Sequence, residues 1–448
     1  MKTYTSWSAL SNYLQSEEGG KLQVNDYSSA EQPFVLIRYV KGKSDLTKPH
    51  VRAFRSVVWD VLENRPVSVT PYKSTDGESL PETESLEGYT VEAFADGVLI
   101  GVFYDKYNDV WRIHTRSTLN AKCRFYSETK TFATMFDEAM GVQKLSPIGK
   151  RDISYSWVLQ HPENRIVVPA PAPRATLVQA VRISADGTVV NAPEELVGRG
   201  YAIASVSGLT TTALVRERLK EFDAKYAHTF QGFVVKNADG TRWKLRGAEY
   251  NRIRNYRSNT PRRDFMWMTL WRTGKLYDYL KYFPEEKFPA NAFVARWKSM
   301  TSDVYHIYVD VFKARTLQKT AIPPKYRPFV YGVHSLYLDT LKPAAKSVNW
   351  QTVLGYMNSR DTPQMLYALN WEVRLAMSQL GDGAMNVPLE PATTVGTTVV
   401  PSADDDDDMP ALIDIAETPC AHAAVGVAVA AVTAVPDGPI GTTDTTVA

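Results

Sequence analysis

The sequence predicts an α+β protein in which antiparallel sheets with helices are followed by an all-α domain and a disordered tail. Three observations predict this order. Runs rich in β-branched and aromatic residues lie between positions 30 and 260, apolar residues recur at steps of three and four after Pro261, and aromatic residues nearly vanish from about Gly381. The chain of 448 residues is long enough for several cores. We expect domains over residues 1–263 and 264–380, then a tail over 381–448.

The first domain is predicted to consist mainly of strands. Three runs near its start are typical of strands because they combine β-branched and aromatic residues: Pro33–Val40, Arg55–Asp60 and Asp96–Tyr104. A hairpin is expected where Asp239-Gly240 separates Phe233–Asn237 from Thr241–Arg246, since glycine accepts the positive φ of a tight turn. Helices are expected at Glu128–Met140 and Thr211–Lys225.

The second domain is predicted to be helical. One long helix is indicated by apolar residues at steps of three and four: Phe293, Trp297, Met300, Val304, Tyr308 and Val311. Similar spacing predicts helices over Phe329–Leu341 and Pro363–Leu380, with a shorter one at Trp350–Met357. After Gly381 the chain is mostly Thr, Val, Ala, Pro and Gly around an acidic run, Asp404–Asp408. Such a segment buries too little apolar area to offset its ordering entropy, so we expect it to be disordered.

Composition narrows the class of protein. The formal net charge is +2, so a surface for nucleic acid has to come from local clustering of basic residues. The two cysteines, Cys123 and Cys420, cannot form a disulfide framework, which favours a reducing compartment. No secretory pattern opens the chain, and the Ala- and Val-rich run 423–435 is too short to span a bilayer. We expect a soluble, cytoplasmic protein that has no membrane partner.

Residues 52–257 contain a series of short motifs that combine cations, glycines and carboxylates. They are Arg55–Asp60, Pro71–Lys73, Val91–Ile100 with Asp96-Gly97, Thr115–Thr118, Ser156–Val167, Gln231–Lys236 and Trp243–Arg246. In this order and spacing the series resembles the adenylyltransferase domain of the phage-type RNA ligases that repair tRNA, members of the nucleotidyltransferase superfamily. The resemblance covers about half of the chain. It implies the fold of ligases and capping enzymes, with ATP as the cofactor and RNA as the substrate.

In that family a lysine attacks the α-phosphate of ATP and forms a covalent lysyl-AMP, while carboxylates bind the ribose and Mg²⁺. The resemblance places Phe94 at the position of the nucleophilic lysine, and a phenyl ring cannot form a phosphoramidate. Val158 and Gln231 stand at two carboxylate positions, so no catalytic residue is assigned and Mg²⁺ stays an open question. Arg246 replaces a lysine and Ser56 a glycine.

The cations of the motif series are largely retained, together with Asp96 and Gly97. The resemblance therefore implies a nucleotide-binding set made of Arg55, Lys73, Asp96, Gly97, Arg116, Lys244 and Arg246. Each residue also has a plain structural explanation. Asp96-Gly97 fits a turn, Arg165 a structural salt bridge, Phe94 core packing, and Lys73 and Lys244 an ordinary surface position.

A basic segment follows the last motif, with Tyr250 and Tyr256 interleaved. Its candidate nucleic-acid-binding residues are Arg252, Arg254, Arg257, Arg262 and Arg263. Guanidinium groups pair with phosphate and aromatic rings stack on bases, so the composition suits RNA or DNA. A solvated face between two domains would have the same composition.

The leading hypothesis is a pseudo-ligase that binds ATP or RNA ends without forming lysyl-AMP, related to ligase-like proteins of large DNA viruses and present in the virus or its host cell. The helical domain or the tail would bind a protein partner. One alternative is an active ATP-dependent RNA ligase in which Lys106 or Lys122 serves as the nucleophile. Another is a scaffold that keeps only the fold, with Arg55, Lys73 and Lys244 pointing apart. The seven scattered histidines show no metal-binding pattern.

Overall fold

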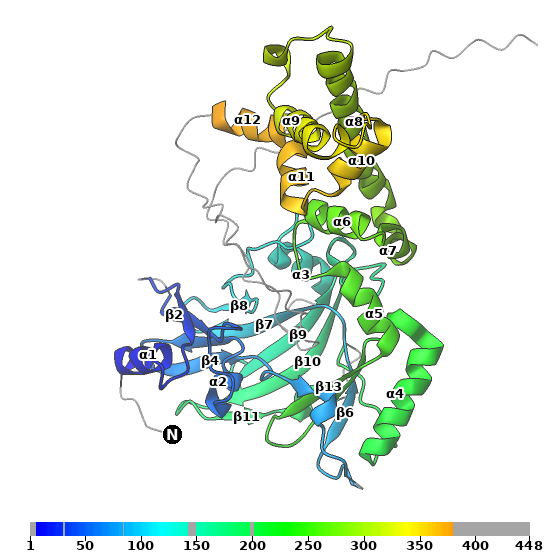
Figure 1. Ribbon diagram of the computed structural model, residues 1–448. Helices are drawn as coiled ribbons and strands as arrows, with labels where there is room; N and C mark the ends of the chain where they lie inside the picture. Colours follow the sequence, from blue (N-terminus) through cyan, green and yellow to red (C-terminus); the bar gives the residue numbers. More distant parts are fainter. Residues whose placement is uncertain (1–5, 30–31, 84, 142–148, 198–200, 380–448) are drawn as a thin grey trace, which may run out of the picture. The chain divides into compact units, whose positions relative to one another are not determined.

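Figure 1 shows the computed structural model of the chain, which describes residues 6–29, 32–83, 85–141, 149–197 and 201–379. The predicted disordered tail, residues 381–448, lies outside the described residues, and so do its acidic run and Cys420. The described part is an α+β structure with antiparallel sheets and a helical C-terminal region, as the sequence predicts.

Three sheets form the first part of the chain. The first is antiparallel in the order β1-β2-β3-β4: Gln23–Asp26, Phe34–Arg38, Val57–Asp60 and Arg65–Val69. The second is antiparallel in the order β11-β10-β9-β7-β8: Val189–Asn191, Arg174–Ile183, Ile153–Gln160, Val98–Asp105 and Val110–His114. The third has the order β5-β13-β12-β6: Thr75–Asp76, Arg242–Arg246, Gly232–Lys236 and Thr90–Ala93. The strands and the hairpin predicted from the sequence are confirmed; β12 and β13 pair antiparallel, with Val235 opposite Trp243.

Strand β9 lies at the centre of the second sheet, and seven of its eight residues are buried (Figure 1). Its side chains alternate in chemistry because neighbouring residues on a strand point to opposite faces. Trp157 packs edge-on against Phe136 of helix α3 (Phe132–Met140). Ser154, on the other face, lies 2.9 Å from the hydroxyl of Ser68 in β4. The second sheet is therefore covered by α3 on one face and by the first sheet on the other.

Five α-helices accompany the sheets: α1 Trp7–Gln15, α2 Pro49–Ala53, α3 Phe132–Met140, α4 Thr212–Tyr226 and α5 Ala248–Arg257. The helix expected from Glu128 begins four residues later, because the hydroxyl of Thr131 accepts a hydrogen bond from the Thr134 N–H and caps the first turn. Helix α4 starts in the same way, with Thr211 accepting from Leu214. Helices α1, α2 and α5 were not expected from the sequence.

The helical region contains α6 Arg263–Arg272, α7 Leu276–Tyr282, α8 Lys287–Tyr308, α9 Arg327–Leu336, α10 Trp350–Asn358, α11 Thr362–Leu369 and α12 Trp371–Gln379. The long apolar face is confirmed, since the predicted residues of α8 are buried. The single helix expected over Pro363–Leu380 is wrong. It is divided at Asn370, whose φ of −98° and ψ of 15° leave the helical conformation. Tyr250 and Ile253 of α5 belong to the same hydrophobic core as these helices. The domain boundary expected at residue 263 stays a prediction.

A buried polar cluster joins the first two sheets around His114. Its Nδ1 lies 2.9 Å from the carbonyl oxygen of Thr115, which can only accept, so Nδ1 carries the proton. Nε2 then accepts from the Ser68 hydroxyl at 2.8 Å. Burial lowers the pKa of the His114 imidazole to about 4, so the ring is neutral at pH 7.

Acid is therefore expected to destabilise the fold through His114. The pKa in the folded state lies below the value of 6.5 in the unfolded chain, so its contribution is complete above pH 6.5 and is lost as the pH falls toward 4. The loss amounts to about 3 kcal/mol of the free energy of unfolding. Urea unfolding at pH 7 and pH 4.5 measures it. His114→Asn should show a smaller acid loss than the unaltered chain, whereas His306→Asn at an exposed position should not. Equal acid losses in all three proteins would contradict the assignment.

Candidate nucleotide-binding site

A cavity of about 150 Å³ is lined by residues of the second and third sheets and of α5. Six of its lining residues are cations: Arg55, Arg116, Lys236, Arg242, Arg246 and Arg254. Two of the described lining residues are carboxylates, Glu92 and Asp96. The described lining residues therefore carry a formal charge of +4, and such a lining favours an anion.

Residues chosen from motifs far apart in the sequence come together in this cavity. Of the predicted site residues, the lining contains Arg55, Phe94, Asp96, Gly97, Arg116, Val158, Gln231, Arg246 and Arg254. Two predicted nucleotide-binding residues are not in the lining. Lys73 is half-buried, and the Lys244 ammonium lies 5.7 Å from the centroid of the Phe94 ring. The motif order thus predicted the location of most of the lining, and the side chains that point elsewhere could be found only from the structure.

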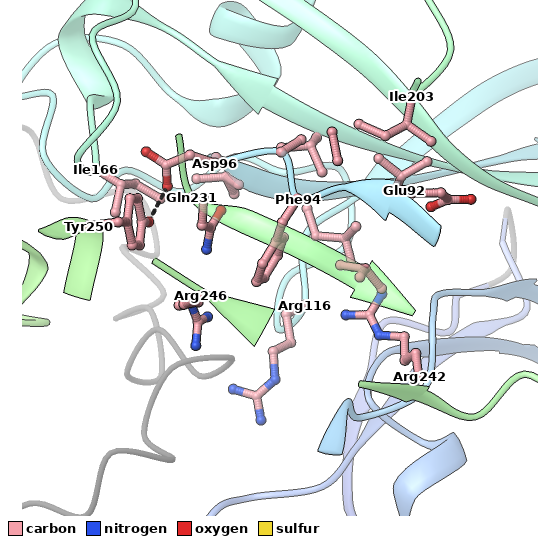
Figure 2. Close-up of a pocket in the computed structure, with 18 of the residues that line it drawn as sticks. Glu92, Phe94, Asp96, Arg116, Ile166, Ile203, Gln231, Arg242, Arg246 and Tyr250 are labelled. Carbon is pink, nitrogen blue, oxygen red and sulfur yellow. Dashed lines mark hydrogen bonds between the residues drawn. The ribbon is translucent and has the colours of Figure 1, made fainter. Parts of the chain in front are cut away.

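Phe94 follows β6 and is half-buried at the cavity wall. Its backbone N–H donates to the carbonyl of Gly232, which fixes the ring next to the β12–β13 hairpin. Figure 2 shows the ring pointing toward Arg116 and Arg246. The Arg246 guanidinium lies 5.0 Å from the ring centroid, within the range of a cation–π contact. Phe94 is thus both a packing residue and part of a wall rich in cations.

Asp96 is held by donors from the protein itself. Its carboxylate accepts from the backbone N–H groups of Val167 and Val168 at 3.0 and 2.7 Å, and from the Tyr250 hydroxyl at 2.8 Å. Burial and the Asp96 carboxylate raise the pKa of Tyr250 well above its ordinary value, so this hydroxyl stays a donor. Asp96 therefore anchors segment 166–168 and α5 to the cavity wall.

Gly97 is required by close packing. A Cβ atom at this position would overlap the Leu159 carbonyl oxygen and come within 2.7 Å of Val158 Cγ1. Strand β7 can approach β9 here only because glycine has no side chain. Gly97 and Val158 thus define one side of the cavity by shape.

Lys236 and Glu92 face each other across β12 and β6. The Lys236 ammonium lies 2.6 Å from the Glu92 carboxylate and donates to the Val178 carbonyl at 3.0 Å. Burial lowers the pKa of Lys236, and the Glu92 charge offsets part of that effect. Glu92, Lys236, Arg242 and Tyr250 were not among the predicted nucleotide-binding residues. Lys236 and Arg242 could have been found from the sequence, because they lie in or beside the last motifs.

Gln231 contributes an unusual polar group. The residue is 6% exposed, and its Oε1 atom has no hydrogen-bond partner among the described residues. Figure 2 places the amide at the cavity, between Asp96 and Phe94. A buried acceptor without a donor costs free energy, so the cavity favours a ligand that brings an O–H or N–H group.

The five arginines of the basic segment have different surroundings. Arg254 lines the cavity. Arg252 pairs with Glu249 at 2.8 Å and Arg262 with Asp264 at 3.3 Å, both on the surface. Arg263 Nε lies 3.8 Å from Glu286. Arg257 is 2% exposed, so its guanidinium belongs to the interior rather than to an exposed basic face.

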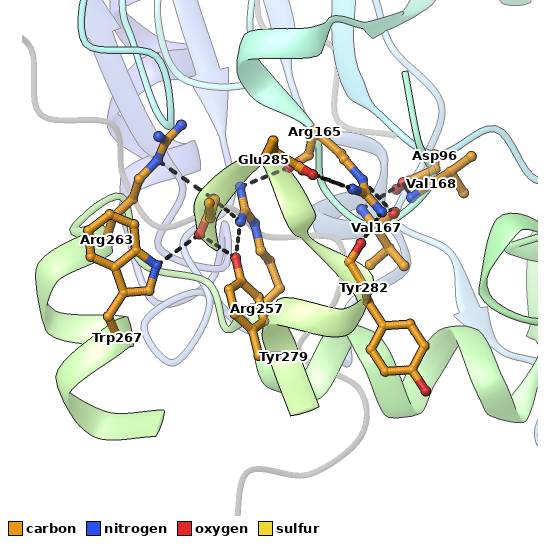
Figure 3. Close-up of polar contacts among 11 residues, drawn as sticks. Asp96, Arg165, Val167, Val168, Arg257, Arg263, Trp267, Tyr279, Tyr282 and Glu285 are labelled. Atoms are coloured by element: carbon orange, nitrogen blue, oxygen red, sulfur yellow. Dashed lines mark hydrogen bonds and ion pairs between the residues drawn. The ribbon is translucent and has the colours of Figure 1, made fainter. Parts of the chain in front are cut away.

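Arg257 forms a buried ion pair with Glu286 of the 3₁₀ turn Pro284–Glu286 (Figure 3). Glu286 also accepts from the Tyr279 hydroxyl at 2.6 Å and from the Trp267 indole at 2.9 Å. Burial alone would raise the pKa of the Glu286 carboxyl, yet the Arg257 guanidinium holds it below its ordinary value. This buried pair therefore fixes α5 to the helical region.

Arg165 forms a second connection beside the first. Its guanidinium donates to the Glu285 carboxylate at 2.8 Å and to the Tyr282 carbonyl at 2.8 Å. Its own carbonyl accepts from Arg257 at 3.1 Å. Figure 3 shows these contacts leading to Asp96 through Val167 and Val168. The cavity wall and the helical region are thus joined by one continuous set of polar contacts.

Within the described ranges, no three His, Cys, Asp or Glu side chains come together as a metal site would require. None of the helices in the described part of the chain is both long enough and apolar enough to cross a bilayer. The described cysteine, Cys123, is buried and forms no disulfide with another described residue.

No protein-family model matches the sequence, and no curated protein matches it. Several solved structures are similar. Form 2 of an archaeal ATP-dependent RNA ligase has a TM-score of 0.37 at 10% identity, covering 66% of this chain and 79% of that one. A putative ATP-dependent DNA ligase from Aquifex aeolicus has a TM-score of 0.35 at 13% identity, covering 84% and 80%.

Proposed function

We propose that the chain is a ligase-like protein of the nucleotidyltransferase fold that binds a nucleotide or a phosphorylated RNA or DNA end without forming lysyl-AMP. The observation that supports this most directly is the convergence of the motif residues. Side chains from Arg55 to Arg246, selected from the sequence for their resemblance to ligase motifs, line one cavity. A scaffold that kept only the fold has no need for six cations around one space.

The charges of the cavity favour phosphate over a carboxylate ligand. Arginine presents several N–H donors in a planar fork that matches phosphate oxygens. The two lining carboxylates are already engaged, Glu92 by Lys236 and Asp96 by Val167, Val168 and Tyr250. Glu92 therefore offsets the charge of Lys236, one of the six described cations, while Asp96 is held by uncharged donors.

The surroundings of several described lysines support a function without a covalent step. Phe94 cannot attack a phosphate. Lys106 pairs with Glu63 beyond the cavity lining, and Lys122 is exposed and also outside that lining. Lys236 does line the cavity, but Glu92 holds its ammonium as an ion pair. ATP is the proposed nucleotide; the role of Mg²⁺ and the kinship with proteins of large DNA viruses stay predictions.

Gln231 provides the test that separates a nucleotide from a bare phosphate. We expect Gln231→Leu to weaken ATP binding about 5-fold, because a charge-independent hydrogen bond of roughly 1 kcal/mol to a ligand hydroxyl or amine is lost. Binding of inorganic tripolyphosphate, which has neither group, should change little. Calorimetric titration of both ligands measures the difference.

The matched control is Gln179→Leu, a glutamine of β10 that is not among the cavity-lining residues. It should bind ATP like the unaltered chain. If Gln231→Leu weakens both ligands equally, the amide acts on the shape of the cavity and not on the nucleoside. If neither ligand binds the unaltered chain, the proposed function is wrong.

A further inference from the structure

A second cavity lies in the helical region, where residues of α9, α10, α11 and α12 come together (Figure 1). Its volume is about 380 Å³, which is within the range of pockets that hold small ligands. We call it the aromatic pocket, after the four rings that line it together with two cations: Phe329, Tyr356, Tyr367, Trp371, Lys325 and Arg360. None of its described lining residues is a carboxylate, and none of them lines the first cavity.

The break at Asn370 places two of these rings at the pocket. Tyr367 belongs to α11 and Trp371 begins α12, so the two side chains lie on either side of the residue that leaves the helical conformation. Their ring centroids are 6.1 Å apart and their planes meet at 64°, as in an edge-on aromatic pair. Tyr367 is 50% exposed, so part of its ring can be reached by a ligand from solvent.

A third ring, that of Tyr356, is held closely against α9. A Cβ atom at Gly332 of α9 would come within 1.7 Å of the Tyr356 hydroxyl oxygen. Glycine weakens the interior of a helix, but here its missing side chain leaves room for the ring. The Arg360 guanidinium lies 4.2 Å from the centroid of this ring, a cation–π contact. The rings of the pocket thus have a cation beside them.

Arg360 also has a hydrogen-bond donor without an acceptor. Its Nε atom is inaccessible to solvent and has no hydrogen-bond partner among the described residues. Its Nη2 atom donates to the Ser359 hydroxyl at 3.1 Å. A buried N–H group without an acceptor costs free energy, so the pocket favours a ligand that brings an oxygen or nitrogen acceptor.

The charge around the pocket is positive. Lys325 is paired with Glu372 at 2.8 Å, and these two charges offset each other. Arg360 and Arg374 have no carboxylate partner within the described ranges, and the Arg374 guanidinium lies 3.5 Å from the centroid of the Tyr367 ring. Proteins that bind single-stranded nucleic acids combine these two features, since aromatic rings stack on bases while cations attract the phosphates.

We propose that the aromatic pocket binds an unpaired nucleotide of a single-stranded nucleic acid. The base stacks on Tyr367 and Trp371, and the phosphates of the strand lie near Arg360 and Arg374. A proline-rich peptide also suits a groove of aromatic rings, but it brings no anion to the two arginines. The pocket is a second site, separate from the first cavity. It rests on the proposed function only for nucleic acid as the class of ligand.

The probe for this site is a single-stranded RNA of about 12 nucleotides with hydroxyl groups at both ends, so that it brings no terminal phosphate to the first cavity. It contains one 2-aminopurine, whose fluorescence is quenched when the base stacks. Tyr367→Leu and Trp371→Leu should each weaken binding to the full-length chain about 10-fold and reduce the quenching at saturation. Arg360→Gln should weaken binding less and make it less dependent on salt.

Two variants control for changes that have nothing to do with stacking. Trp371→Phe keeps a ring and should retain most of the affinity and the quenching. Tyr331→Leu is the matched control, because Tyr331 is 41% exposed on α9 and does not line the pocket. It should bind the RNA like the unaltered chain. Circular dichroism checks that each variant is folded.

Four outcomes would contradict the proposal or the proposed function separately. RNA binding that is unchanged in Tyr367→Leu and Trp371→Leu overturns the aromatic pocket and leaves the first cavity unaffected. A double-stranded RNA that binds as tightly as the single strand shows that no unpaired base is bound, and also overturns it. A decaproline peptide that displaces the RNA from the unaltered chain but does not bind Tyr367→Leu assigns the pocket to a peptide. RNA binding with the expected losses, but without any binding of ATP or of a phosphorylated end, overturns only the proposed function.

Discussion

Glu286→Gln is expected to lower the free energy of unfolding by about 3–5 kcal/mol, because it leaves the buried Arg257 guanidinium without its counter-charge. Both partners are nearly inaccessible, with side-chain exposures of 2% and 3%. The remaining acceptors for Arg257 are the Arg165 carbonyl and the Tyr279 hydroxyl, and both carry only partial charges. Guanidinium-induced unfolding followed by tryptophan fluorescence measures the change.

The control is Glu249→Gln, which removes a similar pair with Arg252 on the surface, where both side chains are more than 40% exposed. Exposed pairs contribute about 0–1 kcal/mol, so this variant should be nearly as stable as the unaltered chain. The double variant Arg257→Met with Glu286→Leu removes both charges and should recover much of the lost stability. A Glu286→Gln protein of unaltered stability would contradict the buried pair.

Arg246→Glu is expected to weaken binding of ATP by more than about 100-fold. The guanidinium lies at the cavity beside Phe94, and its reversal removes a charge-assisted hydrogen bond and adds repulsion toward phosphate. The residue is half-buried at the end of β13 and its side chain has no part in the core, so the fold should persist. Circular dichroism checks the fold, and titration with ATP gives the affinity.

Arg218→Glu is the matched change of charge outside the cavity lining, because Arg218 lies on α4, pairs with Glu221 and is 42% exposed. It should alter ATP affinity by less than a few-fold, mostly at low salt. Arg246→Lys keeps the charge but loses the fork of donors, so an intermediate affinity is expected. Equal effects of Arg246→Glu and Arg218→Glu would mean that the whole surface attracts ATP, and would argue against a specific cavity.

Local patterns were sufficient to predict the elements whose stability is decided nearby in the sequence. The Asp239-Gly240 turn selected the hairpin, and the apolar face of α8 selected the long helix. The break at Asn370 could not be predicted, because the apolar spacing continues through it. Helix α5 was missed because its sequence is dominated by polar residues, and only Tyr250, Ile253 and Arg257 of it are buried.

The site was predicted in part for a similar reason. The order of the motifs placed Arg55, Arg116 and Arg246 in one location, but it could not say what each side chain contacts. The partners of Asp96 lie 71, 72 and 154 positions away, and those of Arg165 lie 117 and 120 positions away. Contacts at such separations depend on the tertiary structure. Because of these contacts Asp96, which the sequence predicts as a ligand contact, anchors the cavity wall.

The most direct test of the central claim uses ATP labelled at the α-phosphate, with Mg²⁺ supplied and the unaltered full-length chain. After incubation, half of the sample is filtered under native conditions and half is run on a denaturing gel. We predict that the label stays with the native protein and is lost on denaturation, as expected for a cavity that binds the nucleotide without a covalent bond. Label that survives denaturation would reveal a lysine nucleophile, and label that is absent from the native protein would show that the cavity does not bind ATP.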